Sequence, residues 1–193
     1  MAETGFGRRG ALAAHFRKMA HNNAWANWRL LSACAQLSEA AFEAARTSFF
    51  PSLHATLNHN LMIDLYYIDA LERGGLGRQV FARFRPLEIA QLLPAQAAAD
   101  RRLIAFCDGA SEDLLATTVD TDRGERGRIE ERVDDLLAHL FQHQIHHRGQ
   151  AHAMLAGTAV APPQLDEYFL RYDSQQTRVE LRRLDLAPPE EFL

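Results

Sequence analysis

Histidine is concentrated in the run His143-Gln-Ile-His-His-Arg-Gly-Gln150, which holds three of the nine histidines of the chain. The run lies in a segment, residues 133–156, whose apolar residues recur at helical spacing. On a helix, His143 and His147 are about one turn apart and project from the same face. A neutral imidazole is a common metal ligand, so the pair predicts half of a metal site that a facing helix would complete.

Two further histidines, His54 and His59, lie near the start of another apolar segment. Periodicity does not choose between them, because each aligns with one of two apolar stripes on that segment. The alternative to a metal site is that the histidines are structural, either on a solvated face or hydrogen-bonded in the interior. The His-Glu-x-x-His pattern of zinc proteases is absent, because Gln144 follows His143. A protease mechanism of that kind is therefore not supported.

Four long helices are expected to position these histidines. Their predicted ranges are 11–37, 51–73, a region from Pro86 to residue 107 that Pro94 should break or kink, and 133–156. A glycine-punctuated stretch before the fourth helix predicts a small β-hairpin or an irregular crossover, and residues 177–184 predict a short C-terminal helix. We expect loops over residues 38–48 and 74–85, and a frayed end at Pro188-Pro189. The sequence thus predicts an all-α four-helix bundle, formed as a single domain over residues 1–193.

Other residues of these helices have more than one interpretation. Asp64 could be a hydrogen-bond partner of a ligating imidazole or an interhelical hydrogen-bond acceptor, and the second role is favoured. Trp25 and Trp28 are expected to pack against a neighbouring helix. Cys34 and Cys107 lie in separate apolar segments and are expected to be core residues without a disulfide framework.

Composition excludes several functional classes. The net charge of −4 and the pI of about 6.1, with arginines spread along the chain, give no basis for nucleic-acid binding. No run approaches the roughly 18 apolar residues of a membrane span. Arg8-Arg9 is followed by a segment that is too short and too charged for an export signal, so we expect no targeting segment and a cytoplasmic protein.

The histidine-bearing segments resemble a known family. Ser52-Leu-His-Ala-Thr-Leu-Asn-His59, followed by Leu61 and Asp64, and His139-Leu-Phe-Gln-His-Gln-Ile-His-His-Arg-Gly-Gln150 are similar to the DinB family of metal-binding four-helix bundles. The segment Trp25-Ala-Asn-Trp-Arg-Leu-Leu31 is similar to that family as well. The resemblance extends to about Gly157 and implies a metal site with one imidazole from the second helix and two from the fourth.

Carried over to this chain, the resemblance implies that the metal ligands are His59, His143 and His147. His54, His139 and His146 then become neighbours, and His139 and Gln150 share the metal-facing side closely enough to contact the ligands. Three imidazoles would leave positions for water or substrate, and they suit zinc or nickel, with iron or copper as further options. No general base is identified in the sequence.

The resemblance also implies a function. Relatives use such a site for chemistry with a low-molecular-weight thiol, so the leading hypothesis is a metal-dependent, thiol-dependent S-transferase acting on a small electrophilic substrate. The alternatives are a metal-dependent hydrolase that activates water, and a non-catalytic stress-response bundle that binds a metal or small ligand. The family also tends to be dimeric, which agrees with the second helix being apolar nearly all round, so a homodimer is expected.

Overall fold

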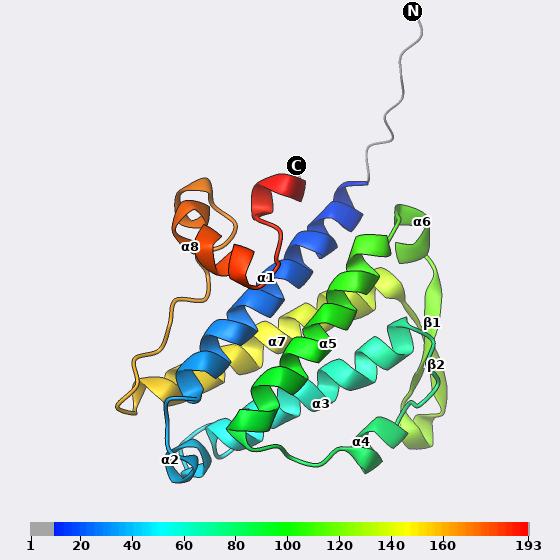
Figure 1. The fold of residues 1–193 in the computed structure, drawn as a ribbon. Coiled ribbons are helices and arrows are strands. Elements are labelled where there is room, and N and C mark those ends of the chain that lie inside the picture. Colours follow the sequence, from blue (N-terminus) through cyan, green and yellow to red (C-terminus); the bar gives the residue numbers. More distant parts are fainter. Residues whose placement is uncertain (1–9, 193) are drawn as a thin grey trace, which may run out of the picture.

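The computed structural model describes residues 10–192, so Arg8 and Arg9 lie outside the described residues. Its frame is four long helices, which lie side by side (Figure 1). They are α1 (Ala11–Cys34), α3 (Leu53–Leu71), α5 (Ile89–Gly109) and α7 (Val133–Ala156). Helices α1 and α3 each contact both α5 and α7, so α1 lies diagonally across from α3. The predicted all-α bundle is confirmed.

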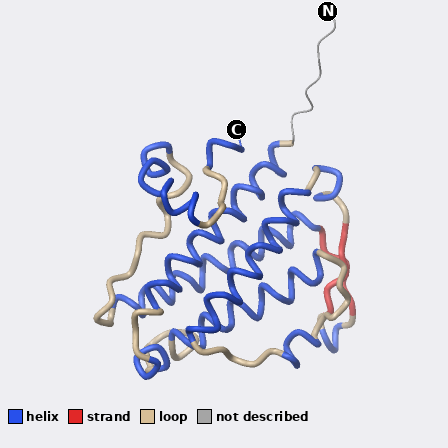
Figure 2. The backbone as a smooth tube through the Cα atoms, in the orientation of Figure 1, coloured by secondary structure: helices blue, strands red, loops and turns tan. Residues whose placement is uncertain are grey.

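A small β-hairpin closes one end of the bundle, where the tube of Figure 2 is red. Strand β1 (Thr118–Asp122) pairs antiparallel with β2 (Arg128–Arg132), and η1 (Gly124–Arg126) forms the turn between them. The positive φ angles of Gly124 and Gly127 suit glycine at this turn. Helix α7 begins directly after β2, with Asp134 and Asp135 in its first turn, where carboxylates favour the positive end of the helix dipole. The hairpin predicted before the fourth helix is therefore present.

The boundaries of the second long helix follow from its caps. Helix α3 begins at Leu53 because the Ser52 hydroxyl accepts a hydrogen bond from the Ala55 amide at 3.0 Å. It ends at Leu71, and the Gly74 amide then donates to the carbonyl of Asp69 at 2.8 Å. The predicted range of 51–73 was thus right within two residues at each end. The neighbours of α3 in the fold include α7, α5, α4, α2 and β1.

Pro94 was expected to break or kink the third long helix, and no break occurs there, because α5 continues through that residue. Pro94 lies near the N-terminal end of the helix and removes one backbone hydrogen bond. Residues on either side of it, including Leu92, Ala99 and Leu103, are buried in the main core. Packing of this face therefore outweighs the single lost hydrogen bond.

Two segments expected to be loops contain short helices. They are α2 (Glu39–Glu43), which is capped by the Ser38 hydroxyl, and α4 (Gln79–Arg83). A third short helix, α6 (Glu112–Leu115), begins after Ser111, whose hydroxyl accepts a hydrogen bond from the Leu114 amide at 3.2 Å. Helices of one or two turns lack a long apolar repeat, so periodicity does not detect them.

The C-terminal segment packs across α1 (Figure 1). Helix α8 (Arg171–Arg183) begins earlier than predicted, and its Leu181 joins Trp25 and Tyr168 in a second apolar cluster. The indole nitrogen of Trp25 donates to a carboxylate oxygen of Glu180 at 2.8 Å. The expected frayed end was wrong, because η2 (Pro189–Phe192) contacts α1. No helix among residues 10–192 has the length and apolar character that crossing a bilayer requires.

Candidate metal centre

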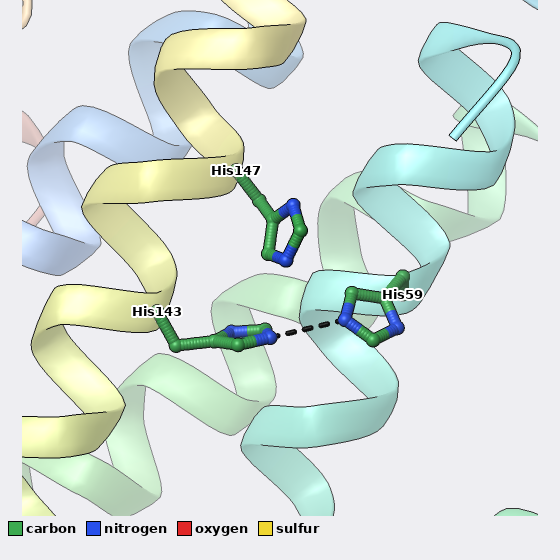
Figure 3. A group of neighbouring side chains, drawn as sticks. All are labelled: His59, His143 and His147. Carbon is green, nitrogen blue, oxygen red and sulfur yellow. Dashed lines mark hydrogen bonds between the residues drawn. The ribbon is translucent and has the colours of Figure 1, made fainter. Parts of the chain in front are cut away.

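The structure brings together the three histidines that the family resemblance singled out. His59 projects from α3, and His143 and His147 project from the facing side of α7, so the three rings meet between the two helices (Figure 3). One ring nitrogen from each lies within 4.8 Å of the others, and Nε2 of His59 is 3.0 Å from Nε2 of His143. Two helices thus supply one compact set of imidazole nitrogens.

The donor set fits a divalent transition metal. Imidazole nitrogens bind zinc at about 2.0–2.1 Å, so the ligands of one ion lie within roughly 4 Å of each other. The spacing of the three histidines is close to that value. Among the described residues no cysteine or carboxylate joins this cluster, so it offers three nitrogen ligands. A site with three protein ligands leaves coordination positions for water or another small molecule.

Gln150 orients one of the three imidazoles. Its side-chain oxygen lies 2.8 Å from Nδ1 of His147, and its nitrogen lies 3.0 Å from Nε2 of His146. With the proton of His147 on Nδ1, the ring donates to Gln150 and keeps Nε2 free for a metal. His146 therefore borders the centre, through Gln150 and through its own ring, whose centroid is 4.8 Å from that of His147.

Burial keeps the candidate ligands in the neutral form that binds metals. Burial lowers the pKa of His59 to about 4, and the nearby charge of His147 acts in the same direction. The pKa of His143 falls to about 3 by burial and by repulsion from the neighbouring histidines. Burial also lowers the pKa of His147, partly opposed by its hydrogen bond to Gln150. The three rings are therefore unprotonated at neutral pH. A metal could bind them without first displacing a proton.

The two remaining histidines named from the sequence lie at different distances from the cluster. The His139 ring centroid is 6.4 Å from that of His143 and 5.4 Å from that of Tyr67, so His139 borders the centre. His54 instead packs edge-on against Phe42, with ring centroids 5.7 Å apart. The structure thus keeps His54 outside the cluster of three.

Two aromatic residues that the sequence analysis missed cover the centre. The ring centroid of Phe50 is 4.3 Å from that of His59 and 5.4 Å from that of His147. Phe49 lies 6.5 Å from His147 and remains 78% exposed. Both come from the connection between α2 and α3, and they lie between the loop expected over residues 38–48 and the helix predicted over 51–73. The available signal was the pair of adjacent phenylalanines directly before Pro51.

A cavity lies beside the covered centre and shares two residues with it. It has a volume of about 560 Å³ between the α2–α3 connection and α7. Phe49 and Gln150 line it, together with Arg46 and Met154. The Arg46 guanidinium is held by the Ala41 carbonyl at 2.7 Å. This space is large enough for a small organic molecule next to Gln150, whose side chain contacts His147.

A buried polar network lies in the bundle interior, behind the imidazoles. All four long helices contribute to it, and its members are Asn23 and Asn27 of α1, Asn60 and Asp64 of α3, Gln96 and Asp100 of α5, and Gln144 and Arg148 of α7. The amide of Gln96 donates to Asp64 at 2.7 Å and to Asp100 at 3.2 Å. The favoured reading of Asp64 as an interhelical acceptor is therefore confirmed.

The network contains two acidic side chains and one basic side chain. Burial and the charge of Asp100 raise the pKa of Asp64 to about 7, and burial raises the pKa of Asp100 to about 6. Burial lowers the pKa of Arg148 to about 10, which leaves its guanidinium charged at neutral pH. Two carboxyl groups thus share one cation, and a proton on Asp64 brings the set to neutrality. Sequence reasoning missed most of this network, although Asn23 and Asn27 stand at helical spacing on an otherwise apolar face.

The sequence is similar to known proteins over most of its length. It is 26% identical over 160 residues to Protein DinB of Bacillus subtilis (strain 168), and the alignment covers 79% of this chain and 92% of that protein. Residues 9–179 match the sequence model of the DinB family, so the similarity continues past Gly157 into α8. That range contains the four long helices and all three histidines of the cluster. The chain therefore belongs to the DinB family.

Proposed function

We propose that His59, His143 and His147 bind a divalent metal ion, with zinc or nickel favoured, and that the protein is a metal-dependent enzyme. Its proposed reaction is thiol-dependent S-transfer to a small electrophilic substrate. The observation that carries the proposal is the meeting of three unprotonated imidazoles with no further protein ligand among the described residues. This arrangement favours a site that accepts an exogenous ligand over a closed structural site.

A divalent ion held by these imidazoles would lower the pKa of a coordinated thiol or water. In the proposed transfer the thiol releases its proton, its sulfur forms a bond to an electrophilic carbon, and the leaving group departs with the bonding electrons. The chain contributes the positions of the imidazoles, fixed in part by Gln150, and the ring of Phe50, which limits access of water to them. The cavity beside His147 offers space for the substrate.

The thiol in this reaction comes from outside the protein. Cys34 and Cys107 are both buried and unpaired. Burial raises the pKa of each to about 12, so neither forms a thiolate at neutral pH. Neither belongs to the histidine cluster. A small thiol that enters by the cavity is therefore the proposed nucleophile.

Metal content tests the site. Protein purified without a metal-affinity tag is analysed by mass spectrometry, as the wild type and as the variants His143→Ala and His54→Ala. The expected result is about one divalent ion per chain in the wild type and in His54→Ala, because His54 packs on Phe42 outside the cluster. His143→Ala should lose the ion. A wild type that takes up neither zinc, nickel nor iron would contradict the metal site.

Turnover then tests the reaction class. Metal-loaded protein is mixed with chlorodinitrobenzene and a small thiol, and formation of the thioether is followed by absorbance. Thiol-dependent turnover that is lost in His143→Ala and kept in His54→Ala supports S-transfer. Release of chloride without added thiol would instead indicate a hydrolase. Full metal loading with no turnover across a panel of thiols and electrophiles would favour a non-catalytic binding protein.

A further inference from the structure

A second cavity lies on the opposite side of α7 from the metal centre. It has a volume of about 410 Å³ and is bounded by α1, α7 and the segment that precedes α8. At 100° per residue, its α7 residues Ile145 and Arg148 are turned by roughly half a circle and a third of a circle from His143. The two cavities have no lining residue in common. The second cavity therefore stands apart from the proposed reaction.

A buried cation lines this cavity. Arg148 is only 5% exposed, and its Nη1 donates to the side-chain oxygens of Asn23 and of Asn27, the latter at 2.9 Å. Within residues 10–192 all of its hydrogen bonds leave from Nη1. The guanidinium thus keeps the N–H groups of Nε and Nη2 for another acceptor. A buried guanidinium is stabilised when each of its N–H groups has a hydrogen-bond acceptor.

A buried amide donor lines the same cavity. Asn22 is 7% exposed, and its side-chain nitrogen is buried without a hydrogen-bond partner in the described part of the chain. Asn22 precedes Asn23 on α1 and is one of the residues that line the cavity. Leaving a buried donor unsatisfied is destabilising. An acceptor from outside the protein would remove this penalty.

The remaining wall is mostly apolar. Ile145, Leu165 and Phe169 line it, and Ile145 and Phe169 are 52% and 40% exposed. Asp166 is the acidic residue that lines it, and Asp166 is exposed. An apolar wall with a few polar groups is typical of small-molecule sites. Among the buried polar groups here, those with unused capacity, Arg148 and Asn22, are donors.

We propose that this cavity binds a small organic carboxylate with an apolar body. The carboxylate would accept hydrogen bonds from Arg148 and Asn22, and the apolar body would pack against Ile145 and Phe169. A planar guanidinium edge matches two carboxylate oxygens. A doubly charged phosphate is a poorer match, because one cation faces the cavity and Asp166 repels added negative charge. The carboxylate is the ligand class that uses both the donors and the apolar wall.

Because of the interior carboxyl groups, the affinity for the carboxylate ligand should depend strongly on its apolar part. Asp64 and Asp100 already act on the charge of Arg148, so the guanidinium does not present a full uncompensated charge to the cavity. Acetate, which buries little apolar surface, should therefore bind much more weakly than octanoate. Because the Asp166 carboxylate repels a negatively charged ligand, Asp166→Asn should strengthen octanoate binding.

Calorimetric titration of metal-loaded protein with octanoate tests the proposal. We expect one site per chain, with octanol binding at least about tenfold more weakly because it lacks the charged acceptor. In proton–nitrogen correlation spectra, the side-chain amide of Asn22 should shift with octanoate. Asn22→Leu should weaken octanoate about tenfold without destabilising the fold, because it removes a donor that has no partner. Val179→Ala is the matched control, since Val179 is 75% exposed and does not line the cavity.

Other results would overturn the proposal. If octanol and octanoate bind equally, the cavity recognises only apolar surface. If chelation of the metal abolishes octanoate binding while Asn22→Leu leaves it unchanged, the carboxylate binds at the metal centre instead. If octanoate produces neither heat nor a shift of the Asn22 amide, the donors do not form a binding site.

Discussion

Nδ1 of His147 lies 2.8 Å from the side-chain oxygen of Gln150, three residues later on the same helix. The contact fixes the orientation of the ring and places its other nitrogen toward His59 and His143. Gln150 also contacts His146 and lines the cavity beside the centre. The Gln150 side chain thus links the proposed metal ligand His147 to the cavity proposed for the substrate.

Gln150→Leu should lower zinc affinity about tenfold, because loss of the acceptor frees the His147 ring to rotate and to change tautomer. Competition with a chromophoric chelator measures the change. Gln142→Leu is the matched control, since Gln142 is an exposed glutamine of the same helix. Equal zinc affinity in the two variants would show that the hydrogen bond does not support the ligand.

Phe50→Ala should increase the rate of zinc release to a chelator several-fold while leaving the stoichiometry at one ion per chain. The ring of Phe50 packs on His59 and His147 and restricts access of water and chelator to them. Phe49→Ala provides the comparison, because Phe49 is largely exposed and lies farther from His147. Stopped-flow measurement of zinc transfer distinguishes the two variants. The idea fails if Phe49→Ala accelerates release as much as Phe50→Ala.

Asp64→Asn should change how stability depends on pH. The pKa of Asp64 in the folded protein is about 7, above the ordinary value of 3.8, so between these values the folded state binds more protons than the unfolded state. Its contribution to the free energy of unfolding therefore falls as pH rises toward 7. The groups that face it are Gln96 and Asp100 of α5 and Gln144 and Arg148 of α7.

Relative to the wild type, Asp64→Asn should gain stability between about pH 5 and about pH 8, on the order of a few kcal/mol. Urea unfolding of the metal-free protein at both pH values measures this gain. Asp113→Asn, at an exposed position, should show no such change. A constant difference between Asp64→Asn and the wild type across this range would mean that Asp64 is ionised throughout.

Neither cysteine should react with iodoacetamide in the native protein at about pH 8. Cys34 and Cys107 are inaccessible, and burial raises the pKa of each thiol to about 12. Mass spectrometry should detect no label in the native protein and two labels in denaturant. Rapid labelling of the native protein would remove the argument that the reacting thiol is exogenous.

The sequence predicted the long helices well because each carries an apolar repeat over several turns. Helix α1 was predicted over 11–37 and runs from Ala11 to Cys34, and the hairpin before α7 was identified from its glycines. The helix does not break at Pro94, because α5 is held by tertiary packing that local propensity does not reveal. The docking of η2 was missed for a related reason: its contact with His21 joins residues far apart in the chain.

The candidate ligands were reached in two steps of different strength. Helical spacing alone paired His143 with His147 but left His54 and His59 equivalent, and the family resemblance chose His59. The aromatic cover at Phe49 and Phe50 was not foreseen, because it depends on how a loop folds over the bundle. The polar network was hidden for another reason, since single Asn and Gln residues do not reveal which partners they will meet across helices.

Each candidate ligand is followed in the chain by a buried polar residue: His59 by Asn60, His143 by Gln144, and His147 by Arg148. The amide of Asn60 donates to Gln144 at 3.1 Å across the α3–α7 interface. Sliding α7 by one residue would move it about 1.5 Å and rotate it by about 100°. Asn60 and Gln144 would then separate, and the Arg148 charge would lose its partners in the interior.

This pairing sets the register of α3 and α7 before any ion arrives. Each histidine directly precedes its polar neighbour on the helix and points in a different direction. The register that joins Asn60 to Gln144 therefore also aligns His59 with His143. The three imidazoles therefore lose their conformational entropy when the protein folds, and this loss does not reduce the affinity for metal. The candidate centre is thus preorganised by residues that lie outside the histidine cluster.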